Sequence, residues 1–266
     1  MLYKRVLSGL LFLPVFYLVA WELPPVYFFI LVLAAVAVGQ HEFYRMAQAR
    51  GYCPNIAIGI VLGLLIVLEF YHPLFPVLGK FFPVVVSVLL IMIARLFSPR
   101  PVDNALEDIA STVLGIFYVA LFFAYQIAIR SGWDGKQWLV FLYLIIWASD
   151  IGAYSIGIPF GKHRLYEKVS PKKSVEGLAG ALVAAMGMAL LCRVWFMPPI
   201  GIGEAVGLAF VLAVAGTVGD FVESLFKRAA GIKDSGTIIP GHGGILDRMD
   251  SMLFAAPVLY YYLKMR

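Results

Sequence analysis

The chain has 266 residues, of which 62% are hydrophobic and 14% are charged, and its mean hydropathy is +0.88. Because a soluble domain carries about a quarter charged residues, a soluble enzyme, a disordered chain and a secreted disulfide scaffold are all excluded. At about 20 residues per helical span, the sequence has room for about eight to ten spans and none for a separate soluble domain. We therefore expect an all-α, polytopic membrane protein that forms a single integral domain over residues 1–266.

Apolar windows bounded by glycine, proline and charged residues predict nine transmembrane helices. The predicted spans are 6–21, 26–43, 56–71, 78–96, 109–129, 138–157, 177–196, 203–226 and 249–263. The first span begins like a signal peptide, but no A-x-A cleavage site follows its long apolar core, so we expect a retained helix. We expect the helices within 1–130 to form a lipid-facing scaffold, and residues 138–266 to supply catalytic helices and cytoplasmic loops.

Positive charges predict the orientation of these spans. With a cytoplasmic N-terminus and an odd number of spans, fifteen Lys and Arg residues fall on the cytoplasmic side and six on the other, as the positive-inside rule requires. The net charge of +5 is then explained without nucleic acid, and we expect the inner (cytoplasmic) membrane as location. Loops 158–176 and 227–248 hold nine of the fifteen charges, so a polyanion-binding function would produce the same bias.

Five carboxylates lie in or beside apolar spans, where an ionised group costs several kcal/mol unless it is paired or hydrated. They are Asp150, Asp220, Glu223, Asp247 and Asp250. Asp220 and Glu223 are three residues apart and share a helix face, as do Asp247 and Asp250. Such oxygen ligands on facing helix ends suit a divalent cation. Asp247 and Asp250 also fit an ordinary role at a helix N-terminus, whereas Asp220 and Glu223 approach a helix C-terminus, where the dipole opposes negative charge and a positive partner is expected.

The loop between the eighth and ninth spans combines glycines with cations. Glycines let backbone N–H groups approach an anion closely, and cations bind phosphate oxygens. The residues of these kinds are Gly236, Gly241, Gly243, Gly244, Lys227, Arg228, Lys233 and Arg248, and His242 lies among them. This combination predicts a polyphosphate site, although a simple ion pair between Asp220 and Lys227 or Arg228 stays open.

The loop between the sixth and seventh spans is also basic. Its segment S-P-K-K-S contains Ser170, Lys172 and Lys173 and has the composition of an ordered anion-binding turn. For Arg164 and Lys168 we expect only a topological role or an attraction to anionic headgroups of membrane lipids.

These segments resemble the signature of the phosphatidate cytidylyltransferases, also called CDP-diacylglycerol synthases. Residues 224–250 match the pattern S-x-F-K-R-x4-K-D-x-G-x2-I-P-x-H-G-G-I-x-D-R-M-D at every fixed position. The segments W-A-S-D-I-G-A-Y and F-G-K-H…S-P-K-K-S-V-E-G are similar to two upstream blocks of that family. Ser174 stands where the family more often has threonine, and it retains the hydroxyl.

The resemblance implies a membrane enzyme that condenses CTP with phosphatidic acid from the bilayer, giving CDP-diacylglycerol and pyrophosphate by in-line attack on the α-phosphorus. It implies Mg²⁺ or another divalent cation on Asp220 and Asp247, with support from Glu223 and Asp250. The catalytic set would further include Lys227, Arg228, Lys233, His242 and Arg248. Substrate contacts would come from Ser170, Lys172, Lys173, Ser224, Gly243, Gly244 and Asp150.

Two alternatives stay open. An ion-coupled transporter would also place carboxylates inside spans, but it predicts charges near mid-span in both halves, whereas here they cluster in the C-terminal half. A cytidylyltransferase acting on another lipid phosphate would carry the same residues. A CDP-alcohol phosphotransferase is excluded because its pattern D-G-x2-A-R-x8-G-x3-D-x3-D is absent. A GxxxG pair at Gly59 and Gly63 permits close helix packing and is compatible with a homodimer.

Overall fold

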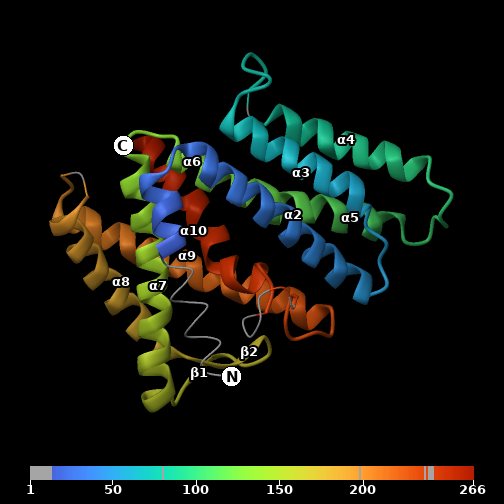
Figure 1. Cartoon of the computed structure of the whole chain (residues 1–266). Helices are drawn as coiled ribbons and strands as arrows, with labels where there is room; N and C mark the ends of the chain where they lie inside the picture. Colours follow the sequence, from blue (N-terminus) through green and yellow to red (C-terminus); the bar gives the residue numbers. More distant parts are fainter. Residues whose placement is uncertain (1–13, 80, 198, 237, 239–242) are drawn as a thin grey trace.

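The computed structural model describes residues 14–266 except 80, 198, 237 and 239–242, and the described chain is mostly helical (Figure 1). The helices are η1 (Leu18–Glu22), α2 (Pro25–Ala49), α3 (Ile56–Tyr71), α4 (Phe82–Leu96), α5 (Ala105–Gly115), η2 (Ile116–Leu121), α6 (Phe122–Arg130), α7 (Gly135–Phe160), α8 (Val175–Trp195), α9 (Ile202–Ala229) and α10 (Leu246–Met265). Here η marks a π-helical segment, and η2 joins α5 to α6 without a break.

Five helical segments of the described chain are long and apolar enough to cross a membrane. They are Pro25–Ala49, Ala105–Arg130, Gly135–Phe160, Val175–Trp195 and Ile202–Ala229. Helices α3 and α4 are apolar but shorter, with 16 and 15 residues. The prediction of a helical, polytopic membrane protein is therefore confirmed. Of the first predicted span, residues 6–13 lie outside the described residues.

Capping side chains explain several helix starts. Asn55 accepts a hydrogen bond from Ile58 N at 3.3 Å before α3, and Ser174 accepts one from Gly177 N at 3.1 Å before α8.

Helix α9 continues to Ala229, three residues beyond its predicted end, and Gly231 follows with φ +71°. Glycine adopts this left-handed conformation readily and commonly follows a helix C-terminus. Lys227 therefore lies on the helix and not in the predicted loop.

A two-stranded hairpin forms in the basic loop after α7, where the sequence predicted a loop, and the rest of the described fold is helical. Strands β1 (Arg164–Tyr166) and β2 (Ser170–Ser174) pair antiparallel, with Arg164 opposite Ser174. The sequence shows no alternation of apolar and polar residues here, and lysine and proline are depleted in strands. Tertiary contacts hold the hairpin instead: Glu176 on α8 accepts hydrogen bonds from Lys162 N at 3.1 Å and from His163 N at 3.2 Å.

Helices α7 and α8 approach each other closely through glycines. A Cβ atom added at Gly152 would lie 2.6 Å from the Cβ of Ala184, and one added at Gly157 would lie 3.4 Å from the Cα of Gly177. Small residues at such spacing let membrane helices pack backbone to backbone. The hairpin connects these two helices, so its position at their end is fixed (Figure 1).

The GxxxG pair on α3 packs against α2 of the same chain. A Cβ atom added at Gly59 would overlap the Tyr44 ring, and one added at Gly63 would overlap the Gln40 amide. Gln40 Nε2 also donates to Gly59 O at 3.1 Å. This pair of glycines therefore has an intramolecular partner and gives no support for a homodimer.

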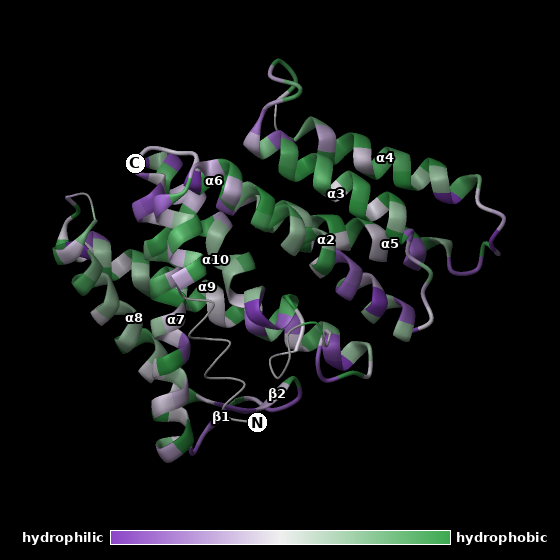
Figure 2. Cartoon of the chain, in the orientation of Figure 1, coloured by the Kyte–Doolittle hydropathy of each residue, from purple (hydrophilic) through white to green (hydrophobic). Residues whose placement is uncertain are grey.

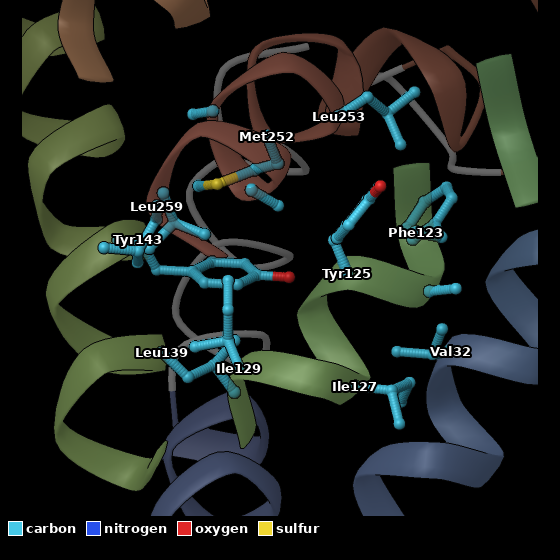
Figure 3. Packing of buried hydrophobic residues seen from close by; sticks show 14 of the residues in the cluster. Val32, Phe123, Tyr125, Ile127, Ile129, Leu139, Tyr143, Met252, Leu253 and Leu259 are labelled. Atoms are coloured by element: carbon cyan, nitrogen blue, oxygen red, sulfur yellow. The ribbon is translucent and has the colours of Figure 1, made fainter. Parts of the chain in front are cut away.

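The apolar core joins helices from both halves of the chain. Figure 3 shows Val32 of α2, Phe123 of α6, Leu139 of α7 and Leu253 of α10 packed around shared space, and each of these side chains is buried. Because α2 and α10 contribute to one core, the start of α10 is held in a fixed relation to the N-terminal helices.

Candidate active site

A cavity of about 870 Å³ lies among α7, the β1–β2 hairpin, α8, α9 and α10. The hairpin is hydrophilic, whereas most of the helical surface is hydrophobic (Figure 2). The charged residues that line the cavity are Asp150, Asp220, Asp234, Asp247, Asp250, Arg164, Lys172, Lys173, Lys227 and Arg248. Five carboxylates and five cations in one cavity of small-molecule size suit a polyanion bound together with a cation.

Lys173 and Asp220 form one ion pair of this cavity. Lys173 comes from β2 and Asp220 from α9, and the ammonium also lies 4.3 Å from the centroid of the Phe221 ring. Ser224 Oγ donates to Asp220 Oδ1 at 3.4 Å. A cation over an aromatic face is attracted by the ring quadrupole. Asp220 is therefore paired with the hairpin lysine, and the pair with Lys227 or Arg228 that the sequence left open is not the one formed.

Lys227 lies between two buried carboxylates. Its Nζ lies 2.6 Å from Asp247 Oδ1 and also forms an ion pair with Glu223, one helical turn earlier. The Glu223 side chain is completely buried, and burying a charge without a partner costs several kcal/mol. One ammonium is therefore shared by two carboxylates, one from α9 and one from α10.

The second oxygen of Asp247 is held by three donors. Gly244 N lies 2.8 Å from Oδ2, and Ser235 N and Ser235 Oγ each lie 2.9 Å from it. Gly243 has φ +83°, and a Cβ atom there would lie 2.5 Å from the same oxygen. The Asp247 carboxylate therefore cannot rotate freely, and its Oδ1 is the oxygen that pairs with Lys227.

The remaining predicted site residues divide into two groups. Asp150, Lys172, Arg248 and Asp250 line the cavity. Among the described residues, the wall does not include Ser170, Glu223, Ser224, Arg228, Lys233, Gly243 or Gly244. His242 lies outside the described residues. The catalytic and binding roles expected for all these residues stay predictions.

Arg228 is not among the described residues that line the cavity, and its side chain instead donates hydrogen bonds to backbone carbonyl groups. Its Nε donates to Val169 O at 3.4 Å and its Nη1 donates to Ile232 O at 3.3 Å. The bond to Val169 connects α9 to the turn of the hairpin, and the bond to Ile232 holds the segment that follows α9.

Sequence reasoning missed several residues of the wall. Arg164, for which we expected a topological role, lines the cavity from β1, and Asp234 and Thr217 line it from the loop after α9 and from α9 itself. The position of Arg164 follows from the hairpin, because strand pairing and not composition places this residue at the cavity. Asp234 occupies a fixed position of the signature pattern, directly after Lys233, and this was the available signal.

The donors present fit a divalent cation by their chemistry. Among the described residues, no group of three or more His, Cys, Asp or Glu side chains is arranged to hold a metal ion. Asp220 and Asp247 nevertheless present carboxylate oxygens to one cavity, and Mg²⁺ prefers oxygen ligands, usually one or two carboxylates together with substrate phosphates.

The fold and this site define a polytopic membrane protein whose polar cavity suits a polyphosphate ligand. The sequence profile of the Cytidylyltransferase family matches residues 3–266, and the chain belongs to this family. The chain is similar to the phosphatidate cytidylyltransferase of Bacillus subtilis (strain 168), with 34% identity over 265 residues that cover 98% of this chain and 97% of the relative.

Two further relatives carry the same name. The phosphatidate cytidylyltransferase of Synechocystis sp. is 32% identical over 266 residues, which cover 89% of this chain and 88% of the relative. That of Staphylococcus saprophyticus is 41% identical over 152 residues, which cover 57% of this chain and 58% of the relative.

Proposed function

We propose that the chain is a phosphatidate cytidylyltransferase that condenses CTP with phosphatidic acid, giving CDP-diacylglycerol and pyrophosphate. The observation that carries the proposal is the cavity of five carboxylates and five cations among the β1–β2 hairpin and apolar helices. It is supported by the similarity to the Bacillus subtilis enzyme along almost the whole chain.

The cations of the cavity would bind the phosphates of both substrates. Lys172, Lys173 and Arg164 come from the hairpin, and Arg248 comes from the first turn of α10. Two anionic substrates repel each other, and cations on opposite walls lower that repulsion and hold the reacting groups in line. The attacking lipid phosphate is already anionic near neutral pH, so the reaction needs no general base.

Asp220 and Asp247 would hold a divalent cation, with Mg²⁺ as the expected ion. A bound magnesium ion would supply charge neutralisation on the CTP phosphates. Asp247 is suited to this role because three donors fix its Oδ2, while Oδ1 pairs with Lys227, which also lines the cavity. Asp250 lines the same cavity and would support the site, and Glu223 would do so through Lys227.

The membrane arrangement is part of the same proposal. Nine crossings, a cytoplasmic N-terminus and cytoplasmic active-site loops in the inner membrane agree with the excess of fifteen over six positive charges. CTP would then reach the hairpin from the cytosol, and phosphatidic acid would enter from the bilayer. The functional division of the chain at residues 130–138 and a homodimer stay predictions.

Purified protein in lipid vesicles tests the function and the choice of acceptor. The vesicles receive CTP and Mg²⁺, and contain phosphatidic acid, a polyprenyl phosphate, or neither. Pyrophosphate release only with phosphatidic acid is the expected result. Release with the polyprenyl phosphate alone would assign another lipid phosphate as acceptor, and no release with any acceptor would refute the enzyme assignment.

A further inference from the structure

Glu42 on α2 is a buried carboxylate that contacts the start of α10. Its side chain is 3% exposed. Ile245 N donates to Glu42 Oε1 and Leu246 N donates to Glu42 Oε2, each at 3.0 Å. The first backbone N–H groups of a helix have no partner within the helix, and a negative charge there is also favoured by the helix dipole. Glu42 therefore caps α10 from a helix about two hundred residues earlier in the chain.

Ser235 connects this cap to Asp247. Its Oγ lies 3.3 Å from Glu42 Oε2 and 2.9 Å from Asp247 Oδ2. A serine hydroxyl has one proton, so the two carboxylates compete for it, and the shorter distance favours Asp247. Glu42 and Asp247 thus lie on either side of one hydroxyl at the N-terminus of α10.

The glycines of this segment make room for Glu42. A Cβ atom added at Gly236 would lie 2.5 Å from Glu42 Oε1, and one added at Gly244 would lie 2.5 Å from both Glu42 oxygens. A Cβ atom at such a distance would force the carboxylate or the backbone to move. The glycines that we interpreted as a phosphate-binding feature therefore also surround a carboxylate of the protein itself.

We propose that Glu42 is a positioning residue for the reaction: by holding the N-terminus of α10 and sharing Ser235, it sets the orientation of the Asp247 carboxylate in the cavity wall. This role rests on the proposed function of Asp247 as a ligand of the divalent cation. It places a determinant of the site in the N-terminal half of the chain, for which the sequence predicted only a scaffold.

Glu42→Gln tests the proposal, because both Glu42 oxygens accept from backbone N–H groups and the amide NH₂ of glutamine would face one of them. Glu69→Gln is the matched control. Glu69 is 1% exposed and accepts from Leu74 N at 2.7 Å and from Phe75 N at 3.3 Å, so it is also a buried carboxylate that caps backbone donors. It is not part of the cavity wall formed by the described residues.

Three measurements on the full-length protein separate positioning from general stability. Hydrogen exchange should accelerate in residues 243–247 of Glu42→Gln but not in Glu69→Gln. Mn²⁺ binding without substrates, followed by electron paramagnetic resonance, should weaken about tenfold or more, and kcat should fall by a similar factor. Glu42→Asp, which keeps the charge on a shorter side chain, should recover part of both losses. The KM for phosphatidic acid should change less than kcat.

Unchanged hydrogen exchange in Glu42→Gln would overturn the proposal, and so would accelerated exchange with wild-type Mn²⁺ affinity and kcat. If Glu42→Gln is not recovered as folded protein, Ser235→Ala carries the same test, because it removes the shared hydroxyl without removing a buried charge. Ser235→Ala with wild-type exchange, Mn²⁺ affinity and kcat would then refute the proposal. Failure of the wild type to form CDP-diacylglycerol would refute the proposed function alone, because the exchange measurement does not depend on activity.

Discussion

Lys227 and Asp247 join the last turn of α9 to the first turn of α10, with Nζ 2.6 Å from Oδ1. The two residues are 20 positions apart, and the connection between them includes the residues that the structure does not describe. The ion pair fixes the two helix ends relative to each other, because both side chains are almost completely buried. The ion pair therefore connects the helix that carries Asp220 to the helix that carries Asp247 and Asp250.

Substitution of either expected metal ligand should stop the reaction. Asp220→Asn and Asp247→Asn should each lower kcat about a hundredfold or more, because each removes a ligand charge worth several kcal/mol of charge stabilisation. Steady-state pyrophosphate release measures the loss, and size-exclusion chromatography checks the fold. Asp103→Asn, in an exposed loop, is the control and should retain wild-type activity. Near-normal turnover in both site variants would contradict their assignment.

Removal of divalent cations should abolish activity reversibly. EDTA should reduce pyrophosphate release to the background, and added Mg²⁺ should restore it, because carboxylates alone cannot neutralise the CTP phosphates. Asp220→Asn should need a higher Mg²⁺ concentration for half of its residual activity. Full activity in the presence of EDTA would exclude a requirement for a divalent cation.

Arg164 and Lys168 should differ although both were expected to be topological charges. Arg164 lines the cavity, whereas Lys168 is exposed in the hairpin turn. Arg164→Gln should raise the KM for CTP or for phosphatidic acid about tenfold, since hydrogen bonds from a charged donor contribute about 1.5–3 kcal/mol. Lys168→Gln should leave both KM values unchanged. Equal KM values in the two variants would show that Arg164 does not contact a substrate.

Close packing of α7 and α8 should make Gly152 intolerant of a side chain. Gly152→Ala places a methyl group against the Gly180 backbone and the Ala184 side chain, and overpacking costs about 1–3 kcal/mol. The apparent unfolding temperature in detergent should fall by several degrees. Gly187→Ala, on the same helix pair, has no atom within 4 Å of the added Cβ and should leave that temperature unchanged. Equal unfolding temperatures in the two variants would refute the packing.

Apolar runs bounded by glycine, proline and charged residues predicted where most helices lie, because these signals are local. Helix α3 has the predicted bounds, and Ser174 and Asn55 mark starts that a sequence pattern can show. The end of α9 was placed three residues too early, because Lys227 is polar and its helical position depends on partners from elsewhere. The hairpin was missed because Glu176 and strand pairing, not local propensity, stabilise it.

The site was predictable where charges stand close together in the chain and not where the fold brings them together. Lys227 and Asp247 lie in the signature segment 224–250 and Asp220 lies four residues before it, and all three line one cavity. Glu42 could not be assigned, because its partners are about two hundred residues away and one carboxylate on an apolar helix carries no local pattern.

The most direct test of the proposed function follows the phosphates of CTP into the products. Purified protein in phosphatidic acid vesicles with Mg²⁺ is given CTP labelled with ³²P at either the α or the γ position. Attack on the α-phosphorus predicts that the α label appears in the lipid fraction and that the γ label leaves as pyrophosphate in equal amount. Transfer of the γ label to lipid, or no lipid label from either CTP, would contradict nucleotidyl transfer by this cavity.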